Sequence, residues 1–416
     1  MRTDWFSLLW ERARAPLSGL SPDEFFSLLK PKCKAVITED ELKKLLASGR
    51  KLRVKLGVDV TGSELHLGHA VPLMLLNLFE RAGHEIHFII GDFTGGVGDP
   101  SGRTEKRVAR KDSEIKKDMK TYVAQVSQLI NTKKAKIHKN SAWLSKIKLA
   151  EFLRVVEHVS FGAVSQREDF RERLKAGSPV SLKEVNYASL MAIDSLHIKA
   201  DVEVGAIDQL LNFMQTRDIM AGEGMQPESI CVTPLIEGTA GDGRKMSKSF
   251  GNYIALADSP ENQFGLVMRV PDAIIESYYI GFGDVYGGEI PELQRFIKEN
   301  PLEAKKQLGE LIVALLHGEA AARKAREDFE RKFSKKEYSK SDAVTIYANL
   351  PSPLFDALVR AMGDDESRSQ IRRLVAEGAV RRLGKHEEVL RDATDIVRDG
   401  DLLKVGKLHV FYFTQK

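Results

Sequence analysis

Cysteine is scarce in this sequence of 416 residues, and long apolar runs are absent from it. The two cysteines, Cys33 and Cys231, lie in unrelated contexts, which argues against a disulfide framework and against a structural zinc site. No apolar run is long enough to span a bilayer, and residues 1–6 carry charge without an apolar stretch behind them. These absences predict a cytoplasmic protein with reduced thiols, no membrane contact and no protein-bound structural metal.

The sequence also has no large excess of one charge, because it contains 63 basic and 59 acidic residues and its net charge is +4. This balance does not by itself indicate a polyanion partner, because local clustering matters more than the total. Basic residues gather at 103–120, 133–148 and 368–385. The hydrophobic fraction of 43% is ordinary for a globular protein, and the length allows two or three domains.

Strand and helix patterns alternate along residues 52–90. Residues 52–58 predict a strand, residues 65–82 carry apolar residues at helical spacing, and residues 86–90 are almost entirely apolar, as in a covered parallel strand. A glycine-rich loop follows at residues 91–102. A strand, a helix, a second strand and a glycine loop predict an α/β fold with a nucleotide-type crevice.

The same patterns divide the chain into three parts. We expect a Rossmann-like doubly wound parallel sheet with an N-terminal helical arm over residues 1–232. A lysine-containing loop and an α-helical domain are expected over residues 233–338, and a small α+β domain over residues 350–416. Within the first part, single helices are expected over residues 103–135 and 150–164.

Two histidines flank a glycine in the segment His66-Leu67-Gly68-His69, where a predicted strand gives way to a predicted helix. A helix N-terminus offers backbone N–H groups and a positive dipole end to anions, and imidazoles there can hydrogen-bond phosphate oxygens. Asp59 and Thr61 add a carboxylate and a hydroxyl just upstream. Two histidines three residues apart more often lie on the surface without a functional role, but their placement between a predicted strand and a predicted helix favours a phosphate site.

Two lysines stand in a second motif, Lys245-Met246-Ser247-Lys248-Ser249, with glycines on both sides. A basic loop among glycines is usually a solvated turn. As a functional site, its lysines would swing onto a triphosphate and pair with the leaving pyrophosphate. Positive donors of this kind stabilise the charge that develops during nucleotidyl transfer, so the two motifs together predict ATP chemistry at the α-phosphorus.

On these residues the chain resembles the class I aminoacyl-tRNA synthetases, and within them the bacterial-type tyrosyl-tRNA synthetase family, whose lysine loop is called KMSKS. Residues 55–69, 89–103 and 187–209 carry the resemblance. It implies activation of L-tyrosine by ATP, with Mg²⁺ on the triphosphate, and transfer of tyrosine to the terminal adenosine of tRNA(Tyr). It also implies a homodimer and an anticodon-binding role for the helical domain.

The resemblance implies a role for each matching residue in the amino-acid site. Asp194 would accept the phenol hydroxyl of tyrosine, and Tyr187 and Asp99 would hold its ammonium group. A buried carboxylate at this position would reject phenylalanine, because it would be left unpaired. Further residues would orient the ribose and the tyrosine carboxyl group: Asp59, Asp208 and Gln209.

The resemblance also implies the contacts to the nucleotide. Thr61 and His66 would touch the γ-phosphate, His69 would lie at the nucleotide, and Lys245 and Lys248 would complete the clamp. The mobile basic side chains of Arg103 and Arg107 would assist catalysis. Other residues of the ATP site would be Gly57, Gly68, Met246 and Ser247.

Several positions depart from the usual pattern of the family. Met191 replaces a glutamine, Ala206 and Ile207 replace glycine and a hydroxyl residue, and Val60 replaces a proline. Lys55 stands where part of the family has a tyrosine that contacts the substrate phenol. Met191, Ala206 and Ile207 bear on tyrosine affinity and selectivity, and local repacking of the pocket is the favoured interpretation.

The end of the chain resembles an S4-type RNA-binding module over residues 365–380. One face of the expected helix is apolar, and Arg368, Arg372 and Arg373 can project from it. Basic side chains on a small platform favour contact with an RNA backbone, and a merely solvated basic helix is the alternative. The charged stretch 320–340 is either a solvated helix or a contact to the anticodon stem.

Three other functions remain open. The chain could be a synthetase for another amino acid, such as tryptophan or a modified tyrosine, although Asp194 and Tyr187 favour a phenol. It could be a small nucleotidyltransferase outside translation, although the lysine loop and the S4-like module argue against this. It could be a non-catalytic RNA-binding protein, which the intact histidines and lysines disfavour.

Overall fold

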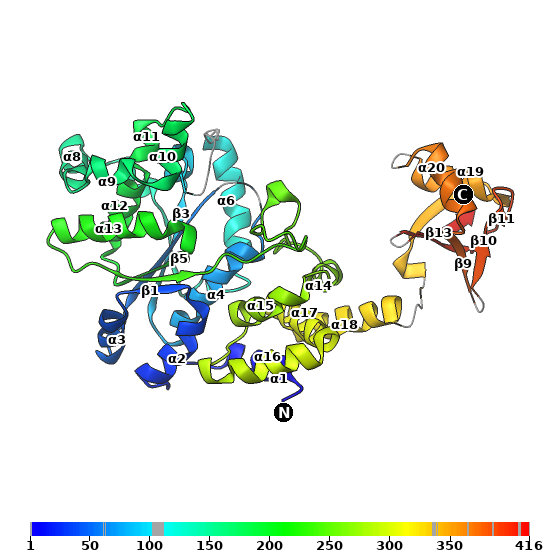
Figure 1. The fold of residues 1–416 in the computed structure, drawn as a ribbon, viewed down its shortest axis with the longest axis horizontal. Coiled ribbons are helices and arrows are strands. Elements are labelled where there is room, and N and C mark those ends of the chain that lie inside the picture. The colour runs from blue at the N-terminus through cyan, green and yellow to red at the C-terminus, as the bar shows by residue number, and fades with distance from the viewer. Residues whose placement is uncertain are drawn as a thin grey trace. The chain divides into compact units, whose positions relative to one another are not determined.

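The computed structural model describes residues 2–60, 62, 64–101, 112–334, 338, 340–363, 366–384, 387–406 and 409–415, without the side chains of residues 112–117, 334 and 341. The chain forms two compact units, Met1–Arg326 and Glu327–Lys416 (Figure 1). The predicted boundaries at residues 232 and 338 stay predictions.

A six-stranded sheet forms the centre of the larger unit. Its order is β1 (Ala35–Ile37), β6 (Ser229–Thr233), β5 (Val202–Ala206), β2 (Arg53–Asp59), β3 (Glu85–Gly91) and β4 (Lys136–Lys139). All neighbouring strands are parallel except β1, which pairs with β6 in the antiparallel direction. The chain turns to opposite sides of β2 to build β3 and β5, which makes the carboxyl ends of β2 and β5 the topological switch point where ligands bind. The predicted Rossmann-like sheet is therefore confirmed.

Helices connect the strands of this sheet. α4 (Leu67–Arg81) joins β2 to β3, α6 (Asp112–Val126) lies between β3 and β4, and α13 (Leu210–Gly222) joins β5 to β6. Between β4 and β5 the chain forms α7 (Ser141–Leu144), α8 (Leu149–Glu157), α9 (Phe161–Ser165), α10 (Glu168–Lys175), α11 (Leu182–Val185) and α12 (Tyr187–Ile198). α12 packs against α13, beside the switch point.

Two predicted helices have different bounds in the structure. The single helix expected over residues 150–164 is wrong: it is divided into α8 and α9, because the Ser160 side chain accepts a hydrogen bond from the Ala163 N–H at 3.3 Å and starts a new helix. The helix expected to reach residue 135 ends at Val126, and its predicted beginning lies outside the described residues.

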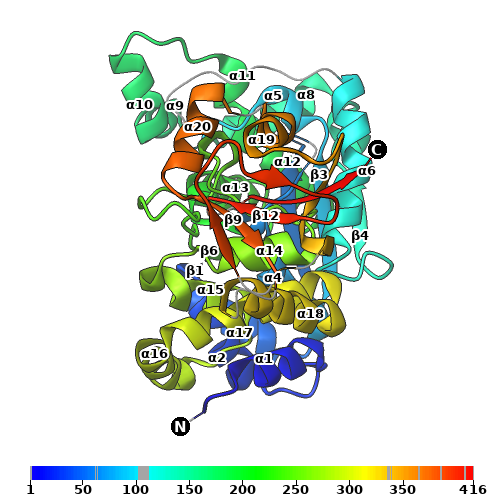
Figure 2. The same cartoon turned by 90° about the vertical axis from the view of Figure 1, so that its right-hand side faces the viewer.

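A helical layer completes the larger unit. It contains α14 (Pro260–Val267), α15 (Ile275–Phe282), α16 (Ile290–Glu299), α17 (Pro301–His317) and the start of α18 (Glu319–Phe329). The N-terminal arm, α1 (Trp5–Arg14) and α2 (Pro22–Lys32), leads into α3 (Glu39–Ala47). α1 packs on α17, and both lie together at one end of the unit (Figures 1 and 2). The buried Gln307 of α17 accepts the Trp5 N–H at 2.8 Å, which ties the arm to this layer.

The smaller unit is α+β, as predicted. Its five-stranded sheet has the order β10 (Glu388–Leu390), β9 (Val380–Leu383), β12 (Leu402–Val405), β13 (His409–Gln415) and β7 (Val344–Ala348), and β8 (Ser352–Pro353) pairs with β11 (Ile396–Val397). α19 (Leu354–Met362) and α20 (Arg368–Ala376) supply Leu358 and Ile371 to a core shared with Leu403 and Phe413 of the sheet.

Candidate active site

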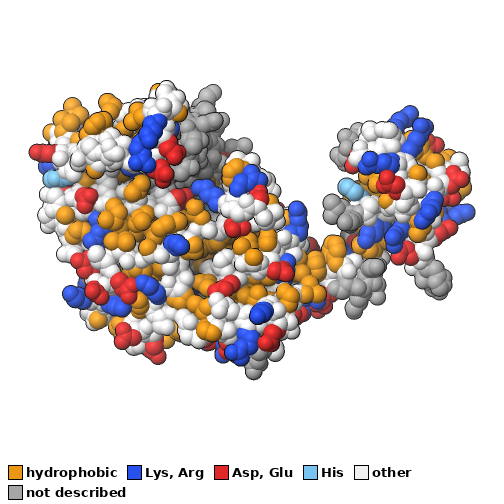
Figure 3. All heavy atoms as spheres, in the orientation of Figure 1, with side chains coloured by type: hydrophobic (Ala, Val, Ile, Leu, Met, Phe, Trp, Pro, Cys, Tyr) orange, Lys and Arg blue, Asp and Glu red, His pale blue; other side chains and the backbone are white. Residues whose placement is uncertain are grey.

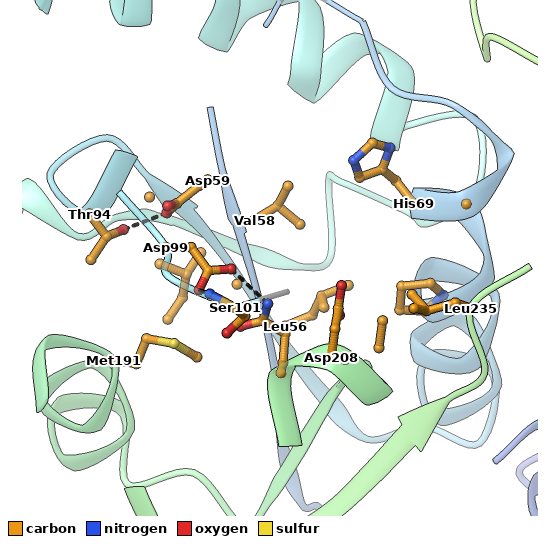
Figure 4. A pocket seen from close by; sticks show the side chains of 18 of the residues that line it. Leu56, Val58, Asp59, His69, Thr94, Asp99, Ser101, Met191, Asp208 and Leu235 are labelled. Atoms are coloured by element: carbon orange, nitrogen blue, oxygen red, sulfur yellow. Dashed lines mark hydrogen bonds between the residues drawn. The ribbon is translucent and has the colours of Figure 1, made fainter. Parts of the chain in front are cut away.

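A cavity of about 580 Å³ lies at the carboxyl ends of β2 and β5. Every residue predicted for the amino-acid and ATP sites that the structure describes lines it: Lys55, Gly57, Asp59, His66, Gly68, His69, Asp99, Tyr187, Met191, Asp194, Asp208, Gln209, Lys245, Met246, Ser247 and Lys248. Figure 4 shows Met191 and His69 on opposite sides of this cavity. Thr61, Arg103 and Arg107 lie outside the described residues.

Asp194, on α12, is a nearly fully buried carboxyl group at one end of the cavity. It accepts hydrogen bonds from Trp143 Nε1 at 2.7 Å and from Asn140 Nδ2 at 3.3 Å. Burial raises the pKa of Asp194 to about 6, although the charge of Lys55 and the two hydrogen bonds oppose this rise. A carboxylate has about four acceptor positions, so Asp194 can take a further hydrogen bond from a bound hydroxyl.

Asp59 ends β2 and is held from two sides. Tyr187 OH donates to Asp59 Oδ2 at 3.1 Å, and Thr94 Oγ1 donates to Asp59 Oδ1 at 2.6 Å (Figure 4). Gly91 makes this approach possible, because a Cβ there would lie 2.1 Å from Asp59 Oδ1. The Asp59 carboxylate therefore has a fixed orientation at the strand end.

Asp99 lies in the glycine-rich loop and is also fixed by neutral donors. Gln209 Nε2 donates to Asp99 Oδ2 at 2.8 Å, and the Ser101 N–H donates to Asp99 Oδ1 at 2.9 Å. Behind them, Asn212 Nδ2 donates to Gln209 Oε1 at 3.0 Å, and Arg167 donates to Asn212 Oδ1 at 2.7 Å. These described donors are amide and backbone N–H groups, and they fix the orientation of the Asp99 carboxylate, which lines the cavity.

Met191 and Ile207, two of the departures from the family pattern, belong to one apolar wall. Both pack against a buried cluster that contains Phe213, Ile230 and Val232. The neighbouring glycine, at position 205, leaves room for this wall, since a Cβ there would lie 2.4 Å from the Phe213 ring. Local repacking of the pocket at these positions stays a prediction.

His66 and His69 lie where α4 begins. The Gly68 N–H donates to His66 Nδ1 at 3.2 Å, and the His66 N–H donates to His69 Nδ1 at 3.2 Å. Burial lowers the pKa of His66 to about 2 and that of His69 to about 4, with smaller contributions from positive neighbours such as Lys248. Both imidazoles are therefore neutral at pH 7. Since each Nδ1 accepts, each Nε2 carries the proton and is a donor for a phosphate oxygen.

The lysine motif lies on a loop whose base is anchored. The Met246 side chain is buried, and its N–H donates to the Ile236 carbonyl at 2.9 Å. The buried Asn252 accepts the Ser247 N–H at 2.8 Å and donates to the Lys245 carbonyl at 3.2 Å. These anchors hold the lysine side chains at the cavity, and loop mobility stays a prediction.

Lys245 reaches across the cavity to Asp208, with 3.2 Å between Lys245 Nζ and Asp208 Oδ2. Asp208 precedes α13 in a short 3-10 turn, Ile207–Gln209, so this ion pair joins the lysine loop to the switch point. A phosphate group bound by Lys245 would compete with Asp208 for this ammonium group, and the contact of Asp208 with a ribose stays a prediction.

Sequence reasoning missed several functional neighbours. Asn140 and Trp143 follow β4, Thr94 begins the short helix α5 (Thr94–Val97), and Asn212 lies in the first turn of α13. Their only sequence signal is a polar side chain just after a strand. That signal is too common to be decisive before the strands are placed side by side.

The structure describes the three predicted RNA-contacting arginines in the smaller unit. Arg368, Arg372 and Arg373 are exposed on α20, while Ile371 and Val375 of the same helix are buried. The amphipathic pattern is confirmed, and contact with RNA stays a prediction.

Across the described ranges, no group of three or more His, Cys, Asp or Glu side chains could hold a metal ion. No helix in the same ranges is both long enough and apolar enough to cross a membrane.

A doubly wound parallel sheet, histidines at the helix that follows its first parallel strand, and an anchored lysine loop define a class I aminoacyl-tRNA synthetase catalytic domain. The family model for tRNA synthetases class I (W and Y) matches residues 47–334. The chain belongs to this family.

Two similar proteins are named tyrosine–tRNA ligase. That of Aquifex aeolicus is 37% identical over 390 residues, which cover 93% of this chain and 98% of the relative. That of Thermotoga maritima is 37% identical over 393 residues, which cover 93% of this chain and 96% of the relative.

Solved structures share the fold at low sequence identity. A C-terminally truncated mitochondrial tyrosyl-tRNA synthetase of Coccidioides posadasii has a TM-score of 0.61 at 22% identity and covers 78% of this chain and 95% of its own. The tyrosyl-tRNA synthetase of Archaeoglobus fulgidus, solved with L-tyrosine, has a TM-score of 0.59 at 23% identity and covers 73% of this chain and 99% of its own.

Proposed function

We propose that the chain is a tyrosine–tRNA ligase, which activates L-tyrosine with ATP and then charges tRNA(Tyr). The observation that carries this proposal is one cavity with Asp194 at one end and the paired histidines and lysines at the other. The near full-length similarity to two ligases of that name supports the choice of tyrosine.

In the amino-acid half of the cavity, Asp194 accepts the phenol hydroxyl of tyrosine. Tyr187 and the fixed carboxylate of Asp99 bind the ammonium group, and Gln209, which already holds Asp99, orients the tyrosine carboxylate. A substrate without the hydroxyl leaves a buried carboxylate short of a partner, which supports discrimination against phenylalanine.

In the first step, the tyrosine carboxylate attacks the α-phosphorus of ATP and pyrophosphate leaves, so no enzyme nucleophile is needed. The Nε2–H groups of His66 and His69 and the ammonium groups of Lys245 and Lys248 stabilise the charge that moves onto the leaving group. Mg²⁺ enters with ATP. The described groups at the phosphate end are imidazoles and ammonium groups, which suit phosphate oxygens, whereas Mg²⁺ prefers oxygen ligands.

In the second step, a hydroxyl of the terminal adenosine of the tRNA attacks the mixed anhydride, and AMP leaves. The exposed arginines of α20, Arg368, Arg372 and Arg373, support binding of the tRNA backbone by the smaller unit.

We also propose that the enzyme acts as a homodimer. Large apolar side chains are exposed on α8 to α11: Leu149 is 72% exposed, Phe161 71% and Leu182 74%. Hydrophobic side chains gather over this part of the larger unit in Figure 3. Large apolar side chains exposed on neighbouring helices are typical of a protein–protein interface, and a second copy of the chain would cover them.

Sedimentation of the double variant Leu149→Glu/Phe161→Glu tests the dimer. We expect the double variant to sediment as a monomer, and Leu302→Glu, at a 60% exposed position on α17, to sediment like the parent chain. A double variant that stays dimeric would contradict this interface.

Amino-acid-dependent exchange of pyrophosphate into ATP tests the main proposal. We expect exchange with tyrosine among all twenty amino acids. Exchange with another amino acid but not with tyrosine would support the alternative, a synthetase for another aromatic or modified amino acid, which the Met191 wall makes worth testing. Exchange with none would contradict an activating enzyme.

A further inference from the structure

A buried lysine lies inside the parallel sheet, beneath the proposed tyrosine pocket. Lys55 of β2 is paired in register with Glu203 of β5, and their side chains are 1% and 0% exposed. The interior of a parallel sheet covered on both faces is usually apolar. A charged pair at this depth is costly unless its partners are well placed, so it needs an explanation.

The contacts of Lys55 connect it to the helix that carries Asp194. Lys55 Nζ lies 2.8 Å from Glu203 Oε1 and donates to Ser195 Oγ, the residue after Asp194 on α12. Ser195 Oγ in turn donates to Glu228 Oε1 at 3.3 Å. Ser195 and Glu228 are fully buried, and Lys55, Glu203 and Asp194 all line the same cavity.

This cluster contains three carboxyl groups and one ammonium group. Glu203 Oε1 contacts the Lys55 ammonium, and the Glu203 carboxyl group also lies within hydrogen-bond reach of Glu228. Burial and the neighbouring Glu228 raise the pKa of Glu203 well above its ordinary value, and the Lys55 ammonium opposes this rise. Burial would lower the pKa of Lys55, but Glu203, Glu228 and Asp194 raise it above its ordinary value, so Lys55 remains an ammonium ion.

Several other titratable groups of the described residues lie near the cluster. His138 and His197 pack against the Trp143 ring, which donates to Asp194, at centroid distances of 5.7 and 4.4 Å. Asp92, after β3, opposes ionisation of Asp194. Arg217 of α13 donates to the backbone carbonyl of Glu228 and lies 3.7 Å from Glu41, so another carboxylate shares its charge. Among these groups, Lys55 is the cation whose charge lowers the pKa of Asp194.

We propose that Lys55 is a specificity-determining positioning residue, whose buried ammonium keeps Asp194 ionised and so makes the pocket require a hydroxyl donor on the substrate ring. This inference rests on the proposed function. An ionised carboxylate can only accept hydrogen bonds, whereas a protonated one also donates. Trp143 and Asn140 already donate to Asp194, and an ionised Asp194 has its remaining acceptor positions for the phenol hydroxyl alone.

Without Lys55, Asp194 would hold a proton at neutral pH, because its burial would no longer be opposed by a nearby cation. The pocket would then bind tyrosine less well and distinguish it less sharply from phenylalanine. Both losses would disappear at high pH, where Asp194 ionises again. The phosphate end of the cavity holds separate groups, so kcat would change little.

The variant Lys55→Met tests this, because methionine has a similar length and no charge. Pyrophosphate exchange is measured with tyrosine and with phenylalanine from pH 5.5 to pH 9. In the parent enzyme, KM for tyrosine should rise only below about pH 6, the pKa of Asp194. In the variant this rise should begin at least about one pH unit higher. At pH 7, a shift of about one unit raises KM roughly twofold, and a shift of about two units raises it roughly tenfold. The preference for tyrosine should fall in parallel and recover at pH 9.

Two further variants separate this role from a structural one. Lys55→Met/Glu203→Gln removes the whole ion pair and should show the same upward shift of the KM profile. Glu203→Gln alone keeps the cation and should leave the profile at the parent position or move it to lower pH. A pH-independent loss of activity in both Lys55 variants, or an unshifted KM profile, would overturn the proposal. Absence of tyrosine exchange in the parent enzyme would instead overturn the proposed function.

Discussion

Replacing Asp194 by asparagine should change stability and activity in opposite directions. The pKa of this buried carboxyl group lies at about 6 rather than at 3.8, so the folded chain holds the ionised form at a cost. A difference of about two pH units corresponds to about 3 kcal/mol at neutral pH. The amide of Asp194→Asn carries no charge and keeps one oxygen for Trp143. We therefore expect the ligand-free variant to be more stable by up to about 3 kcal/mol.

The sign of this effect depends on pH. Because the pKa of Asp194 is higher in the folded than in the unfolded chain, the folded chain binds more protons between about pH 3.8 and about pH 6. The cost of ionising Asp194 is therefore complete above about pH 6 and fades as the pH falls toward 3.8. The stability advantage of Asp194→Asn should be full at pH 7.5 and clearly smaller at pH 5.

Activity should fall in the same variant. A hydrogen bond to a charged group contributes roughly 1.5–3 kcal/mol, so kcat/KM for tyrosine should fall by about 10–150-fold. Phenylalanine has no hydroxyl to lose, so its kcat/KM should change little or rise. Denaturant unfolding of the ligand-free larger unit at the two pH values, and exchange kinetics with both amino acids, measure these quantities. The reasoning is refuted if the variant is less stable at pH 7.5, or if its stability difference is the same at pH 5.

Three further changes test other parts of the cavity and the chain. Lys248→Ala should slow adenylate formation at least about 100-fold, because this lysine acts on the triphosphate, whereas tyrosine binding, measured by equilibrium dialysis, should stay within about twofold. Unchanged kinetics would show that Lys248 does not bind the triphosphate. Met191→Gln places an amide in the apolar wall and should lower KM for tyrosine several-fold if the substrate ammonium group lies beside it. An unchanged KM would mean that this side chain only packs in the wall and does not contact the substrate. Deleting residues 350–416 should leave pyrophosphate exchange intact and weaken charging of tRNA at least about tenfold; equal loss of both would contradict separate roles for the two units.

The strands that carry the site were predictable because their patterns are strong. β2 and β3 have clear alternation or an apolar run, and the structure confirms both predicted strands within one residue at each end. The two edge strands escaped prediction for physical reasons. β1 has only three residues, too few for a period to show, and β4 is the mostly polar segment Lys136–Lys139, whose pairing with β3 depends on tertiary context.

Many of the residues that line the cavity were predictable for a different reason, namely that two local motifs and three sequence blocks resemble one family. The partners that orient them were not. Trp143 and Asn140 lie far from Asp194 along the chain, and no local pattern says that their donors converge on its carboxylate. A motif identifies the group that meets the substrate, whereas the groups that set its charge and direction depend on how distant strands are paired.

Lys55 illustrates this limit. Its strand alternates apolar and basic residues, which is typical of a half-solvated strand, and Arg53 two residues earlier does lie at a partly exposed end, where it pairs with Asp201. Lys55 has the same periodicity and is nevertheless fully buried, because α12 covers the sheet at that point and brings Ser195 onto its ammonium. The two-residue period of a strand places both side chains on the same face of the sheet. It does not show which part of that face is exposed to solvent and which part a helix covers. Only the pairing of β2 with β5, which sets Glu203 beside Lys55, makes a buried cation tolerable here, and the same pairing places its charge close enough to act on Asp194.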